Sequence, residues 1–167
     1  MKTAIILLSL IILTAEAPAQ TSGQAIVIDG GTVEIHGARI RIWGIDALES
    51  AQTCQTAAQE RYRCGEQAAS ELRAFIARRP VTCVEVDRDR YKRAVAVCTV
   101  DGVELARWLV QNGYAIDRPR YSLGNYSLAQ SEAKRARKGV WAGSFVEPWR
   151  YRECVEANGH PLNCSDD

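Results

Sequence analysis

The sequence contains only two histidines, His36 and His160, and no two cysteines are separated by exactly two residues. Zinc sites are usually built from such closely spaced Cys and His ligands, so the sequence does not favour a zinc protein. The chain also lacks an excess of one charge, because 21 Lys and Arg residues face 20 Asp and Glu residues. A protein with a net charge of +1 has no overall field to attract nucleic acid, so any such attraction must be local.

The one long apolar run lies at the N-terminus, from Ala4 to Leu13, and is shorter than the roughly 20 residues of a membrane span. Lys2 precedes this run, and Ala17-Pro18-Ala19 supplies the small residues that come before a signal-peptidase cut. We therefore predict a signal peptide over residues 1–19 rather than a membrane anchor. The mature protein would begin at Gln20 and be exported, to the periplasm or out of the cell.

The sequence after this cut contains no repeat, low-complexity segment or domain linker. Its length suits one domain, since domains cluster around 100–150 residues. We predict a domain over residues 20–147 and a polar, cysteine-tied tail over residues 148–167. Arginine supplies 17 of the 21 basic residues, a composition that favours paired contacts with oxyanions.

All six cysteines lie after the predicted cut, and an even number of cysteines in a small exported domain indicates disulfides. Cys83 and Cys98 are symmetric about a turn near Asp89-Arg90, which would place them opposite each other on a hairpin. The other four can close two short local loops. We predict the pairs Cys54–Cys64, Cys83–Cys98 and Cys154–Cys164.

Strand-like alternation dominates the first part of the mature chain and helical periodicity the later part. We expect a three-strand meander over 25–45, a loop over 47–64, a hairpin over 81–100, a loop over 118–125, and helices over 65–79, 103–112 and 127–138. Five strands with these helices predict an α+β fold, a five-stranded OB-type β-barrel with three helices. Such barrels bind ligands on the face of their second and third strands, where Arg41 and Asp46 would lie.

Three short segments combine acids, arginines and a glycine-rich turn: Asp29 to Thr32, Arg41 to Glu49 and Asp89 to Arg93. Cleavage of a phosphodiester needs a cation on the oxyanion, a base for the water, and arginines for the developing charge. Each segment alone is ordinary, since Asp-Gly-Gly is a good hairpin turn and an exposed arginine is usually only solvated. The combination is what indicates phosphodiester chemistry.

The three segments, in this order, resemble the motifs of the staphylococcal nuclease (thermonuclease) family over roughly Ala25 to Trp141. Those motifs are Asp-Gly-Asp-Thr, Arg-(Leu/Ile)-x-Gly-(Ile/Val)-Asp-(Thr/Ala)-Pro-Glu and Asp-x-Tyr-Gly-Arg. The corresponding segments here are Asp29-Gly30-Gly31-Thr32, Arg41-Ile-Trp-Gly-Ile-Asp46-Ala-Leu-Glu49 and Asp89-Arg90-Tyr91-Lys92-Arg93.

The resemblance implies three catalytic roles. Glu49 would be the general base on the attacking water, and Arg41 and Arg93 would hold the phosphate and stabilise the charge of the transition state. Leu48 replaces the proline of the second motif, and Lys92 replaces the glycine of the third. Both substitutions remove residues that shape tight turns.

The resemblance also implies a Ca²⁺ site. Asp46 would be a direct ligand, and the main-chain carbonyl of Ala47 would lie beside it. Asp29 would lie just outside the direct ligands or replace one of them. Gly31 occupies the position of the second carboxylate ligand of the family motif. Since Ca²⁺ is held by oxygen ligands, the loss of this carboxylate should weaken its binding.

Two functions follow from these observations. The first is an exported, Ca²⁺-assisted phosphodiesterase that acts on DNA or RNA with an incomplete metal site. The second is a nuclease-fold protein with little or no catalysis that serves the envelope, since the short exported chain and its cysteines also resemble nuclease-like proteins of bacterial exopolysaccharide (succinoglycan) biosynthesis. The partner would be nucleic acid in the first case and an envelope component in the second, and we expect a monomer without a membrane span.

Overall fold

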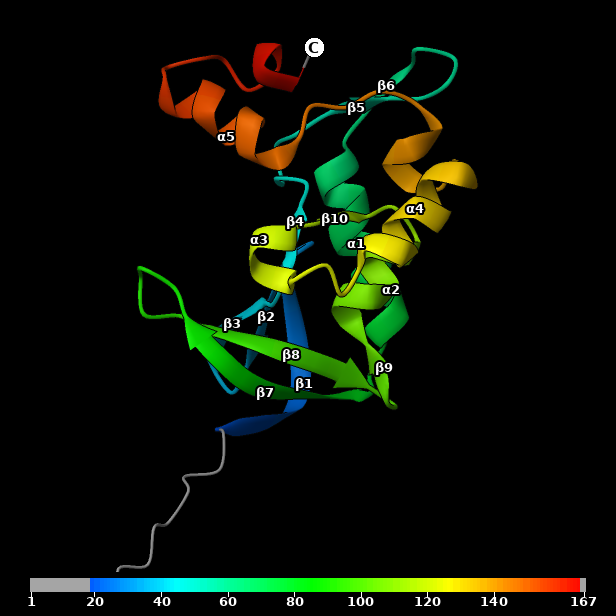
Figure 1. The fold of residues 1–167 in the computed structure, drawn as a ribbon. Coiled ribbons are helices and arrows are strands. Elements are labelled where there is room, and N and C mark those ends of the chain that lie inside the picture. Colours follow the sequence, from blue (N-terminus) through cyan, green and yellow to red (C-terminus); the bar gives the residue numbers. More distant parts are fainter. Residues whose placement is uncertain (1–18, 166–167) are drawn as a thin grey trace, which may run out of the picture.

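A closed β-barrel is the main feature of the computed structural model, which describes residues 19–165 (Figure 1). Its strands are β1 (Gln20–Asp29), β2 (Thr32–Ile35), β3 (Ala38–Ile42), β7 (Pro80–Arg88) and β8 (Ala94–Val100). They follow the order β3-β2-β1-β7-β8 with antiparallel neighbours, and a parallel pairing of β3 with β8 closes the ring. The predicted α+β fold with a five-stranded OB-type barrel is confirmed.

Strand β1 starts earlier than the sequence pattern predicts and pairs with two other strands. Its first half, from Gln20 to Gln24, pairs with β7, and its second half, from Ala25 to Asp29, pairs with β2. A strand that passes from one partner to the other allows a small sheet to curl and close. The side chains that point inward are apolar and buried, among them Val33, Ile35, Ile42, Val81 and Val100.

The helices cover one end of the barrel and lie above it in Figure 1. Helix α1 (Cys64–Ile76) packs against β1, while α2 (Leu105–Gln111) packs against β8 and α4 (Ser127–Arg135). The remaining elements are short: β4 (Ile45–Ala47), β5 (Cys54–Gln55), β6 (Arg61–Tyr62), β9 (Val103–Glu104), β10 (Ala115–Asp117) and the 3₁₀ helices η1 (Gly139–Ala142) and η2 (Asn163–Ser165).

The predicted number of helices is wrong, because residues 19–165 contain five α-helices rather than three. Helix α3 (Pro119–Ser122) lies in the segment predicted as a loop, and α5 (Pro148–Glu156) lies in the predicted tail. Both begin at a proline, whose fixed φ suits the first helical position. Their short polar sequences show little apolar periodicity, so the sequence does not reveal them. Such helices are stabilised mainly by tertiary contacts.

The structure contains three disulfides, and each joins a cysteine to the next cysteine along the chain: Cys54–Cys64, Cys83–Cys98 and Cys154–Cys164. Within residues 19–165 no helix is long and apolar enough to cross a membrane. The predicted signal peptide lies outside the described residues except for Ala19. The boundaries at residues 20 and 148 therefore stay predictions.

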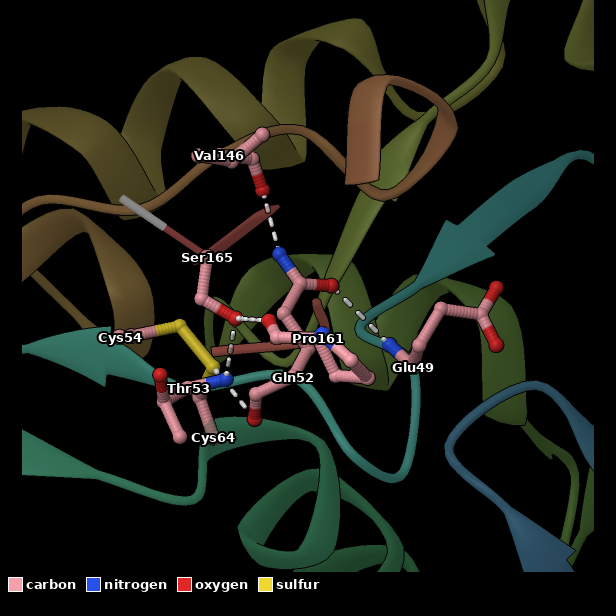
Figure 2. Close-up of a disulfide and its surroundings, with 8 residues drawn as sticks. All are labelled: Glu49, Gln52, Thr53, Cys54, Cys64, Val146, Pro161 and Ser165. Carbon is pink, nitrogen blue, oxygen red and sulfur yellow. Dashed lines mark hydrogen bonds between the residues drawn. A yellow bond between two sulfur atoms is a disulfide. The ribbon is translucent and has the colours of Figure 1, made fainter. Parts of the chain in front are cut away.

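Gln52 fastens the C-terminal segment to the loop that carries Glu49 (Figure 2). Its side chain is fully buried, accepts a hydrogen bond from the Glu49 amide (3.1 Å) and donates one to the Val146 carbonyl (2.6 Å). A second link follows, since the Thr53 amide donates to Ser165 Oγ at 3.1 Å. These bonds join the start of α5 and the η2 turn to the segment just after β4.

Replacement of Gln52 by Leu should lower the free energy of unfolding by about 2–4 kcal/mol, because a buried donor and a buried acceptor would both lose their partners. Urea unfolding monitored by circular dichroism measures this change. Gln67→Leu on the exposed side of α1 is the matched control and should change stability by less than about 0.5 kcal/mol. Equal midpoints for the two variants would contradict a bridging role for Gln52.

Candidate functional site

The turn after β3 brings Asp46 to the centre of the candidate site. Gly44 has φ +77°, and a Cβ atom there would lie 2.8 Å from the Tyr126 ring, so glycine is the residue that fits. The chain then enters β4, where Asp46 pairs with Ile116 of β10. Arg118 follows β10 directly, and its amide donates to the Gly44 carbonyl at 3.0 Å. The β4–β10 pair thereby places Arg118 beside Asp46.

Three arginines converge on the carboxylate of Asp46, whose side chain is only 4% exposed. Arg152 binds it with two parallel hydrogen bonds, from Nη1 to Oδ1 at 3.0 Å and from Nη2 to Oδ2 at 2.8 Å. Arg41 Nη2 lies 3.5 Å from Oδ1, and Arg118 Nε lies 3.9 Å from Oδ2. A buried carboxylate is stable only when its charge is compensated, and Arg152 supplies the closest compensation.

Arg152 also binds the predicted general base, because its Nη1 lies 2.6 Å from Oε1 of Glu49. The hydrogen bond with Asp46 raises the pKa of the Arg152 guanidinium; burial opposes this effect, and the bond with Glu49 adds to it. The group therefore stays charged at any physiological pH. One guanidinium thus fills the space between the two acids that the family resemblance assigns to metal binding and catalysis.

Arg152 lies in the predicted tail and is not among the site residues that the sequence predicts. It reaches the site because α5 packs against β4, a contact between segments about 100 residues apart. No local pattern distinguishes Arg152 from Arg150, which forms a surface ion pair with Glu147 at 3.4 Å. The role of Arg152 depends on the tertiary fold.

Asp29 and Gly31 lie at the turn between β1 and β2, and Ala47 of β4 lies against this turn. The Gly31 amide donates to Oδ1 of Asp29 at 2.8 Å, so one oxygen of this acid is already used in the turn. A Cβ atom at position 31 would lie 3.4 Å from Cβ of Ala47 and 3.8 Å from Asp29 Oδ1. A side chain at this position would fit and would point toward the residues expected at the metal site.

The residues present do not fit a Ca²⁺ ion in this arrangement. Ca²⁺ takes about six to eight oxygen ligands. Asp46 and Glu49 are bound to Arg152, and Gly31 provides no carboxylate. The described part of the chain contains no group of three or more His, Cys, Asp or Glu side chains arranged to hold a metal ion.

Arg93, the second predicted phosphate clamp, is held by its own hairpin. Its Nε donates to Oδ2 of Asp89 at 2.6 Å, and its amide donates to Oδ1 at 3.0 Å. Burial alone would raise the pKa of Asp89, but hydrogen bonds from Arg93 and the Tyr91 amide outweigh it and lower that pKa. Among the described residues, no hydrogen bond or ion pair joins Arg93 to the acids of the Asp46 cluster.

The two other substituted motif positions keep the local fold. Lys92 adopts φ +67°, the left-handed conformation that the glycine of the family motif would take without strain. Leu48 is 1% exposed and packs in a small core with the Cys54–Cys64 disulfide and Val140. An apolar contact thus replaces the stiffness of the family's proline in the segment that precedes Glu49.

A family model described as "Staphylococcal nuclease homologue" matches residues 39–143. The succinoglycan biosynthesis protein ExoI of Rhizobium meliloti (strain 1021) is 45% identical over 121 residues, and the match covers 71% of this chain and 63% of ExoI. An uncharacterized endonuclease of Escherichia coli O157:H7 is 29% identical over 133 residues, 75% of this chain and 80% of that protein. Since the family model spans more than half of the sequence, the chain belongs to the staphylococcal nuclease family.

Proposed function

We propose that this chain is an exported nuclease-fold protein that serves exopolysaccharide biosynthesis without Ca²⁺-assisted hydrolysis. The observation that carries this proposal is the Arg152 guanidinium, which bridges Asp46 and Glu49. A cation would have to displace this bridge before it could bind Asp46 and Glu49 together. The permanent charge of arginine and three short hydrogen bonds oppose that displacement.

The attachment of α5 supports the same proposal. The Cys154–Cys164 disulfide joins α5 to the η2 turn, and the Gln52 network fastens both ends of this segment to the loop after β4. Arg152 is therefore carried by a helix with several attachments rather than by a free tail. A helix held in this way keeps the bridge in place when the solvent contains competing ions.

The relatives and the disulfides support the biological setting. ExoI is named as a succinoglycan biosynthesis protein, and it is 45% identical to this chain over the matched segment. Three disulfides are typical of a protein that folds in an oxidising compartment, which agrees with the predicted signal peptide. We infer a role in the periplasm or outside the cell.

The proposal predicts that the purified protein does not cleave DNA or RNA in a Ca²⁺-dependent way. Rates measured with labelled single-stranded DNA, duplex DNA and RNA should be the same in millimolar Ca²⁺ and in chelator. The melting temperature should also be unchanged by Ca²⁺, because a ligand that does not bind the folded state cannot stabilise it. Cleavage that appears with Ca²⁺ and disappears with chelator would overturn the proposal.

Restoring the metal ligand while removing the bridge should create Ca²⁺ binding. Gly31→Asp combined with Arg152→Gln returns a carboxylate to position 31 and frees Asp46 and Glu49. We expect millimolar Ca²⁺ to raise the melting temperature of this double variant, since binding to the folded state alone stabilises it. Gly31→Asp with Arg150→Gln is the matched control, which keeps the bridge and should respond much less. Equal responses would show that Arg152 does not close the site.

Ca²⁺-assisted hydrolysis of DNA or RNA is the second candidate function. One observation favours it: Glu49 is 38% exposed, and its second oxygen binds none of the described residues. Glu49 would then act as the base on water, and Arg41 and Arg93 would hold the phosphate. This function requires a rearrangement that releases Arg152 from Glu49.

A test in cells separates the two candidates. The mutant gene for Glu49→Gln should restore exopolysaccharide yield in a deletion strain as well as the wild-type gene does, if the chain acts without hydrolysis. Glutamine preserves the size of the side chain and its hydrogen bonding but cannot accept the proton of water, a role worth roughly 10²–10⁴ in rate. Restoration by the wild-type gene alone would favour hydrolysis.

A further inference from the structure

Arg41 and Arg118 carry hydrogen-bond donors that residues 19–165 leave largely unused. Arg41 donates from Nη2 to Asp46 Oδ1 at 3.5 Å, and Arg118 Nε lies 3.9 Å from Asp46 Oδ2. Within residues 19–165, the Arg118 guanidinium makes no hydrogen bond to any protein acceptor. The two side chains are 38% and 27% exposed, so both reach the solvent.

The cluster has more positive than negative charge. Three guanidinium groups contact two carboxylates, those of Asp46 and Glu49. Arg152 binds both acids through short hydrogen bonds. Three positive charges against two negative ones leave one positive charge in excess, and Arg41 and Arg118 present it on the solvent-exposed side of the cluster. Such a surface attracts an anion.

Trp149 gives one of these arginines a fixed orientation. The Arg118 guanidinium lies over its ring, 4.3 Å from the centroid. Stacking of this kind restrains the plane of the guanidinium and leaves its N–H edge free for a ligand. Arg118 and Trp149 both lie outside the three motif segments, so this arrangement shares Arg41 with the predicted Arg41–Arg93 clamp and adds two residues that the clamp does not include.

We propose that Arg41 and Arg118, anchored by Asp46 and ordered by Trp149, form an oxyanion site for one carboxylate or phosphate group of an acidic ligand. This inference rests on the proposed function, because it needs the Arg152 bridge to satisfy Asp46. The planar fork of arginine matches both anion types with paired N–H···O bonds. Asp46, which the family resemblance assigns to a cation, thus orients arginines for an anion in this chain.

Isothermal titration calorimetry at low ionic strength tests the site with three probes: inorganic phosphate, trigalacturonate and a short oligothymidylate. We expect saturable binding of at least one probe to a single site. Arg118→Gln and Arg41→Gln should each weaken it about tenfold or more, since each removes charged hydrogen-bond donors. Arg73→Gln on the exposed face of α1 is the matched control and should leave affinity unchanged. Tighter binding of trigalacturonate would identify a carboxylate ligand, and tighter binding of the other two a phosphate ligand.

Arg118→Lys keeps the charge but loses the planar fork, so it should bind more weakly than the wild type and more tightly than Arg118→Gln. Circular dichroism verifies that each variant is folded. Absence of saturable binding for all three probes, or equal weakening by the Arg73 control, would overturn the anion site. Ca²⁺-dependent cleavage would overturn the proposed function and this inference with it, whereas a protein that neither cleaves nor binds any probe would overturn this inference alone.

Discussion

The buried carboxylate of Asp46 is the constraint on which the site depends. A carboxylate that is 4% exposed must be compensated by charge and hydrogen bonds, and here three arginines from separate segments do this. Arg41 comes from the end of β3, Arg118 from the end of β10 and Arg152 from α5. The Gly44 turn and the β4–β10 pair bring Asp46 and Arg118 next to each other.

The C-terminal segment belongs to the site rather than to a separate tail. The Cys154–Cys164 disulfide joins α5 to the η2 turn. Hydrogen bonds with Gln52 and Thr53, drawn in Figure 2, hold this segment against the loop that carries Glu49. A guanidinium placed there does electrostatically what a metal ion would do, because it puts positive charge between two acids. It does so at fixed geometry and cannot expand its coordination. This difference is the physical basis of the proposal that the chain acts without Ca²⁺-assisted hydrolysis.

The barrel could be predicted because its signals are local. Period-two alternation in Thr32–Ile35 and Ala38–Ile42 places apolar residues inside, and the short Asp-Gly-Gly turn joins two of its strands. The α1 helix was also expected from its apolar spacing. Helices α3 and α5 were not, because their short polar sequences carry little periodicity and are ordered by the residues they touch.

The sequence by itself determined the five-stranded barrel, the family motifs and the absence of a carboxylate at position 31, because strand alternation and motif spacing are properties of contiguous residues. Tertiary structure decided what replaces the missing ligand. Asp46 and Arg152 are 106 residues apart, and their contact depends on how α5 packs against β4. The same holds for the stacking of Arg118 on Trp149, because Arg118 lies between β10 and α3 whereas Trp149 lies in α5. Long-range packing, which no local pattern encodes, gave a predicted cation site an excess of positive charge.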